Sequence, residues 1–293
     1  VSGRIAALGI TTGVYGGIGD SAMGVEKTDS GIRMALVDGV GNNETGVLMP
    51  ERIHAEIVTR AALRQPVIPG LDLAEAQIKK IKTNGERPEY SLIPDDPLFC
   101  MLAFAEVSDT QYGQFLVSPV VYGDVSILAL APEAGGEFGV SSLRFLYFNP
   151  FADRSKDHIR APRFHNVRQP ESRAPNPSIL PSGSVVILAD DGGMMALIDP
   201  EILSAAGSDY PKDRLRDLES DFSRMVPAFD TGKYSITDYH TQLTVSLFPL
   251  MGLINRLGRR EAFLALFNSL SQHPQAVPDD VALLAAVVGE GKV

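Results

Sequence analysis

Short, strongly apolar runs bounded by turn-forming residues are the feature that most constrains how this chain can fold. They occur at residues 4–10 and 32–37, and then in close succession at LFCMLAFAEV, QFLVSPVVY, SILALA and SLRFLYF. Only short turns separate the central runs, whereas parallel neighbours need a crossover of a dozen or more residues. These runs therefore predict an antiparallel meander, and SVVILA and the closing VALLAAVV predict two more strands.

Helical patterns separate these clusters of strands. Pro50 begins a helix through ERIHAEIVTRAALRQ, in which apolar residues recur at helical spacing. A shorter helix is expected from Leu73 to Ile81. The stretch from PEIL to FSRMV and residues 235–271 are also helical in pattern.

Residues 149–183 are rich in Pro, Arg, Asn and Ser and predict a long irregular connection over the surface. This basic connection is the most positive part of the chain, through Arg154, Lys156, Arg160, Arg163, Arg168 and Arg173. The whole chain has a formal net charge of -10, from 36 acids and 26 bases. That balance argues against a nucleic-acid partner, because such binding depends on Lys and Arg neutralising phosphates. A local basic groove remains an alternative.

Several other classes of protein lack support. The single cysteine, Cys100, lies in an apolar run, which indicates a core position and excludes an intrachain disulfide. The glycines of GVYGGIGD are in no dinucleotide-loop or P-loop register, and the chain has no Gly-x-Ser-x-Gly motif. The five histidines have no metal-ligand spacing. No signal peptide and no apolar window of about 18 residues is found, so we expect a cytoplasmic protein without a membrane span.

Aspartates fall where apolar runs begin or end. Asp38 follows IRMALV, Asp191 follows SVVILAD, and the pair Asp279-Asp280 leads into VALLAAVV. A rigid sheet can hold such carboxylates at fixed positions, and Mg²⁺ and Mn²⁺ prefer oxygen ligands of this kind. Carboxylates gathered without a cation would raise one another's pKa values, so a cluster would imply a metal. The alternative is that each Asp-Gly pair is only a turn.

Four segments together resemble the type 2C metal-dependent protein phosphatases, including the short bacterial members. GDSAMGVEKTDSGIRMALVDGVGNNETG resembles the family's opening block, and VVYGDVSILAL resembles its Gly-Asp hairpin. LPSGSVVILADDGGMMALIDPEIL resembles its strand, Asp-Gly turn and helix, and PDDVALLAAVV resembles its closing strand.

The resemblance implies one α+β domain over residues 1–293, a four-layer α/β-β/α sandwich of two antiparallel sheets flanked by helices. It implies hydrolysis of phosphoserine or phosphothreonine in a phosphoprotein substrate by metal-activated water. The cofactors would be two Mn²⁺ or Mg²⁺ ions, bridged by Asp38. The metal site carried over by position consists of Asp20, Asp38, the Gly39 carbonyl, Asp191 and Asp279, with Asp38 and Asp191 as the catalytic pair.

The chain also departs from the family pattern. Gly19 stands where the opening block usually has its first acid, which would weaken the second metal. Tyr15 stands where the family often has an Arg that holds the substrate phosphate. Tyrosine can donate one hydrogen bond but lacks the charged, bidentate guanidinium of arginine. Val40 stands where animal members have a His acid. The alternative function is therefore a pseudophosphatase, a regulatory module that binds a protein partner without turnover.

Overall fold

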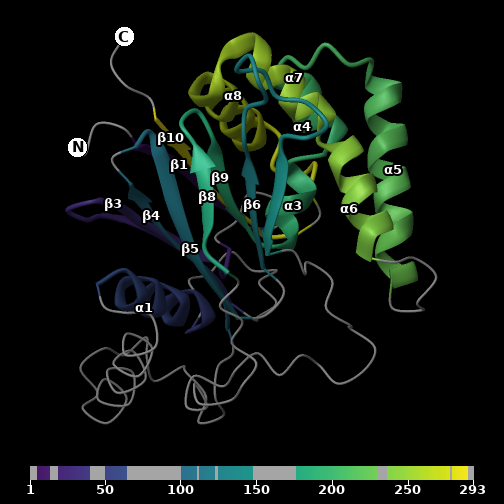
Figure 1. The fold of residues 1–293 in the computed structure, drawn as a ribbon. Coiled ribbons are helices and arrows are strands. Elements are labelled where there is room, and N and C mark those ends of the chain that lie inside the picture. Colours follow the sequence, from purple (N-terminus) through teal and green to yellow (C-terminus); the bar gives the residue numbers. More distant parts are fainter. Residues whose placement is uncertain are drawn as a thin grey trace.

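The computed structural model describes residues 5–13, 19–39, 50–64, 100–110, 112–122, 125–147, 176–229, 236–277 and 279–289, and its ribbon is drawn in Figure 1. Two five-stranded sheets form its centre, and every pairing between described strands is antiparallel. Sheet A has the order β1 (Ile5–Thr12), β10 (Val281–Val288), β9 (Val185–Ala189), β6 (Ser126–Leu130) and β7 (Leu143–Tyr147). Sheet B has the order β2 (Ala22–Lys27), β3 (Gly31–Gly39), β4 (Cys100–Asp109), β5 (Gln114–Tyr122) and β8 (Ser178–Pro181).

Helices cover the two outer faces (Figure 1). The helix α1 (Pro50–Arg64) packs on sheet B through β2, β3 and β4. On the other side, α3 (Asp191–Ala196) and α8 (Arg259–Gln272) lie against sheet A. The same hydrophobic core also includes residues of α4 (Pro200–Ala205), α5 (Lys212–Phe229), α6 (Ile236–Ser246) and α7 (Phe248–Leu257). The predicted four-layer sandwich of helices, two antiparallel sheets and helices is confirmed. In the part of the chain that the structure describes, no helix is long and apolar enough to cross a membrane.

Alternating side chains explain why the sheets stack. In β9, Val186 and Leu188 point into the layer between the sheets, whereas Val185 and Ile187 point toward the helices. In β3, Met34 and Leu36 enter the same inter-sheet layer, and the alternate residues Ala35 and Val37 face α1. Successive strand residues point to opposite faces, so a strand that is apolar on both can bury both.

The strand β10 is the clearest case, because all eight of its residues are buried. It lies between β1 and β9 inside sheet A, and its two faces meet the helices and sheet B. The continuous run VALLAAVV is what such a position requires, because neither face meets water.

Two details of the predicted meander are wrong. The strand β6 does not follow β5 in one sheet but pairs with β7 and β9 in sheet A, where all five of its residues are buried. The free edge of β5 is taken instead by β8, a strand inside the range expected to be irregular, 149–183. The rest of that range up to residue 175 lies outside the described residues, as does the helix expected at residues 73–81.

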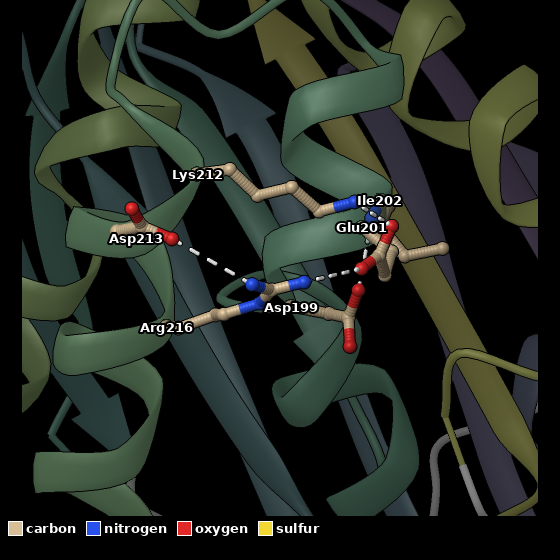
Figure 2. A network of polar contacts seen from close by, with 6 residues as sticks. All are labelled: Asp199, Glu201, Ile202, Lys212, Asp213 and Arg216. Atoms are coloured by element: carbon tan, nitrogen blue, oxygen red, sulfur yellow. Dashed lines mark hydrogen bonds and ion pairs between the residues drawn. The ribbon is translucent and has the colours of Figure 1, made fainter.

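The corner between α4 and α5 is held by a polar network (Figure 2). Asp199 caps α4, since its Oδ1 accepts a hydrogen bond of 2.8 Å from the Ile202 N–H. Glu201 pairs with Lys212 and, at 3.5 Å, with Arg216 of α5. Exposed ion pairs of this kind contribute little to stability, so we interpret the network as orienting the two helices.

Acidification should destabilise the protein partly through His54 of α1, which is 3% exposed. Burial lowers its pKa from 6.5 to about 4, so only the unfolded chain takes up a proton between these values. This contribution is therefore complete above pH 6.5 and is lost as the pH falls toward 4. At about 1.4 kcal/mol per pKa unit the loss approaches about 3 kcal/mol. Urea unfolding at pH 7 and pH 4.5 measures it. The His54→Gln variant should lose less stability over that interval, and equal losses would contradict the assignment.

Candidate metal centre

Four chain segments bring acids to one end of the sandwich. Asp20 and Ser21 directly precede β2, and Asp38 and Gly39 are the last two residues of β3. Asp190 follows β9, and Asp279-Asp280 precedes β10. The antiparallel register sets these ends together, because Ala22 pairs with Val37 and Ala189 with Leu283. We call this group the acid cluster: Asp20, Asp38, Asp190, Asp191, Asp279 and Asp280.

Asp38 lies at the middle of the cluster. Its Oδ1 accepts a hydrogen bond of 2.8 Å from the hydroxyl of Ser21, which also lies 3.2 Å from Asp190 Oδ2. Burial raises the pKa of Asp38 well above its ordinary value, and the charges of Asp190, Asp191 and Asp20 raise it further. Only the hydrogen bond from Ser21 opposes these effects. The predicted residues Asp20, Asp38 and Asp191 therefore interact electrostatically in the folded chain.

Asp190 is the least exposed member of the cluster, with 1% of its surface exposed. It caps α3, since its Oδ1 accepts a hydrogen bond of 2.6 Å from the Gly193 N–H. Burial first and the charge of Asp191 second raise its pKa well above the ordinary value, while hydrogen bonds with the backbone of Ala282 and Gly193 lower it. The alternative that Asp191 and Gly192 form only a turn does not hold, because they belong to the first turn of the helix α3.

Asp20 is joined to the far end of the chain. It is 3% exposed, and its N–H donates a hydrogen bond of 3.1 Å to Asp280 Oδ2. Gly39 permits this position, because a Cβ at residue 39 would lie 2.7 Å from the Asp20 carbonyl oxygen. The predicted pair Asp38-Gly39 is therefore the end of β3, and Asp20 lies close against it.

Asp279 is the exposed member of the cluster. Its Oδ1 accepts a hydrogen bond of 2.9 Å from the N–H of Asp280. Its Cβ lies 3.4 Å from the position that a Cβ on Gly192 would take. Asp279 therefore lies beside the first turn of α3, whereas Asp280 reaches toward Asp20.

Cys100 begins β4 opposite Gly39 and is fully buried. Burial, and then the charge of Asp38, raise the pKa of its thiol well above the ordinary value. The thiol therefore stays protonated and is not a nucleophile, as its place in an apolar run predicted.

The donor chemistry of the cluster fits a hard divalent cation, because the acids offer only oxygen and repel one another around Asp38. Among the described residues, however, no three His, Cys, Asp or Glu side chains stand in the arrangement of a ligand shell. Asp38 and Asp190 both meet the Ser21 hydroxyl, and Asp190 also caps α3.

Reasoning from the sequence missed Ser21, Asp190 and Asp280 as members of this site. Asp190 and Asp280 each stand next to a predicted acid, and a position in sequence does not tell which of two adjacent carboxylates faces the centre. Tyr15, Val40 and Gly123-Asp124 lie outside the described residues.

No protein-family model and no curated protein sequence matches the chain. Solved structures do. The RsbU and RsbW domains of Rv1364c from Mycobacterium tuberculosis match with a TM-score of 0.50 and 12% identity, covering 100% of this chain and 62% of that one. RsbX in complex with magnesium gives 0.49 and 10%, covering 98% and 97%. The serine/threonine phosphatase PstP/Ppp of Mycobacterium tuberculosis gives 0.43 and 13%, covering 98% and 100%.

These likenesses concern the fold. The chain has the two-sheet sandwich fold of the type 2C serine/threonine phosphatases, as the resemblance of its four segments predicted. At 10–13% identity the likeness says nothing further about activity, which has to be argued from the acid cluster.

Replacing Gly192 with Ala should destabilise the fold by about 2 kcal/mol or more, because the added Cβ would collide with the Asp280 carbonyl oxygen. The matched control is Gly252→Ala on α7, where the nearest atom is Tyr210 Cε2 at 3.9 Å. That helical alanine should instead stabilise the protein by about 0.5–1 kcal/mol. Urea unfolding of both variants measures the contrast. A Gly192→Ala protein as stable as the wild type would refute this close packing of α3 against β10.

Proposed function

We propose that residues 1–293 form one type 2C-like domain that hydrolyses phosphoserine or phosphothreonine in a protein, using Mn²⁺ or Mg²⁺. The observation that carries the proposal is the convergence of Asp20, Asp190 and Asp191 around Asp38, with Asp280 hydrogen-bonded to Asp20. Acids so close together repel one another in a partly buried site, and a divalent cation would offset that repulsion. The fold agrees with this function, and the residues named below make it specific.

The proposed ligands are the five residues named from the sequence: Asp20, Asp38, the Gly39 carbonyl, Asp191 and Asp279. Asp38 would be the acid that two ions share, and the charges of Asp20 and Asp191 both act on it. A bound divalent cation would lower the pKa of a water molecule and neutralise charge on phosphoryl oxygens.

The protein's own contribution is positioning. The strand ends fix Asp38 and Gly39 against Asp20, and the α3 cap fixes Asp190 and Asp191 beside them. Such preorganised charge needs little rearrangement during the reaction. The partners would be a phosphoprotein substrate or a regulatory protein.

A second candidate is the pseudophosphatase, which would bind a protein partner without turnover. Gly19 favours it, because the residue beside Asp20 contributes no carboxylate. The space next to it is taken by the Asp280 carboxylate, whose Oδ2 would lie 3.2 Å from a Cβ on Gly19. The two candidates differ in turnover and not in fold.

Phosphatase activity should require Mn²⁺ and should fall by at least about 100-fold in Asp38→Asn and Asp191→Asn, a loss of about 2.7 kcal/mol in barrier terms. The assay uses p-nitrophenyl phosphate and a phosphothreonine peptide with Mn²⁺ titrated. Asp213→Asn is the matched control, because the Asp213 side chain is 96% exposed on α5. Thermal unfolding without metal checks folding, and Asp38→Asn should not be less stable there, since its neighbours repel the charge it loses.

Calorimetry with Mn²⁺ separates the outcomes. Binding with metal-dependent turnover that Asp213→Asn retains supports the enzyme. Binding by folded protein without turnover favours the pseudophosphatase. Folded protein that neither binds Mn²⁺ nor turns over substrate would refute the proposed metal centre.

A further inference from the structure

A buried serine hydroxyl lies between two acids of the cluster. Ser21 is 1% exposed, and its Oγ lies 2.8 Å from Asp38 Oδ1 and 3.2 Å from Asp190 Oδ2. A hydroxyl carries one proton and can donate fully to only one oxygen at a time. The shorter distance assigns the stronger bond to Asp38.

The backbone holds Ser21 in this place from sheet B. Ala22 pairs with Val37 at the start of β2, so the preceding residue, Ser21, comes level with Asp38. Its side chain is therefore directed by strand pairing and not by a free loop.

Asp190 completes the arrangement from sheet A. One of its oxygens is fixed by the Gly193 N–H at 2.6 Å in the cap of α3, and the other faces Ser21. A neutral Asn caps helices equally well. Capping alone therefore does not account for a carboxylate buried to 1% exposure, and its second oxygen is the one that meets the site.

We propose that Ser21 is a positioning residue of the metal centre: its hydroxyl holds the Asp38 carboxyl in one orientation, and Asp190 holds Ser21 from the opposite sheet. This inference rests on the proposed function, in which Asp38 is shared by both ions. Hydrogen bonds to ionised carboxylates are stronger than neutral ones. Groups that orient a ligand in this way typically change metal affinity by about 10- to 100-fold when they are removed.

Calorimetric titration of Ser21→Ala with Mn²⁺ tests the role, and the affinity should fall by about 10- to 100-fold. Since the hydroxyl acts through metal binding, the kcat lost at low Mn²⁺ should largely return at saturating Mn²⁺, with KM for the phosphopeptide little changed. Ser21→Cys keeps the size of the side chain but donates only weakly, so it should show most of the same loss. If Ser21→Ala does not fold, the Mn²⁺ titration of Ser21→Cys takes its place.

Ser184→Ala is the matched control. Ser184 is also fully buried and donates a hydrogen bond, of 2.8 Å to the Pro181 carbonyl, but it lies at the start of β9 and Asp190 follows its end. It should lower stability without changing Mn²⁺ affinity. Unchanged Mn²⁺ affinity in folded Ser21 variants would overturn the positioning role while leaving the proposed function intact. A wild-type protein that binds no Mn²⁺ would overturn both.

Discussion

Interleaved apolar side chains between sheets A and B determine where every acid of the cluster lies. Met34 and Leu36 of β3 share this layer with Leu188 of β9 and Leu284 of β10. Side chains alternate along a strand, so a slip of one residue would exchange the two faces of the strand. In β3 such a slip would place Ala35 and Val37 between the sheets and carry Asp38 to the face of α1. The register that fills the core is the same register that assembles the site.

The cluster brings together acids whose charges act on one another around Asp38. Hydrogen bonds to Asp38, Asp190 and Asp280 come from the Ser21 hydroxyl and from the N–H groups of Gly193 and Asp20, among others. These donors are neutral, and they stabilise a carboxylate less than a positive charge does. The pKa values of Asp38 and Asp190 are raised first by burial and then by the charges of neighbouring acids.

Much of the fold followed from local patterns, because alternation, apolar runs and Pro50 act within a few residues. The helix α1 and the strands β3, β5, β9 and β10 were predicted close to their observed bounds. The sheet to which β6 belongs was not predictable in this way. An apolar run buried on both faces fits either sheet, and the choice depends on the distant β9.

The site, like the fold, was predictable only where a local sequence pattern marks its residues. Asp38 and Asp191 were predicted because each follows an apolar run, and in the structure the charge of Asp191 acts on Asp38. The contribution of Ser21 depends on strand pairing and on a helix cap formed 169 residues later in the chain. No local pattern marks such a serine. Asp280 stands next to the predicted Asp279, and the sequence does not tell their roles apart. They differ only in the folded chain, where Asp280 accepts a hydrogen bond from the Asp20 N–H.

Cys100 gives this end of the sandwich a built-in chemical reporter. It is the chain's only cysteine, it is fully buried opposite Gly39, and Asp38 helps to keep its thiol protonated. Because the side chain is fully buried, a thiol reagent reaches it only when the structure around it opens. The rate of labelling therefore measures local opening at this end of the sandwich, with no residue changed. An ion bound between Asp38 and the neighbouring strands would slow this labelling, so the labelling rate would report whether the site is occupied.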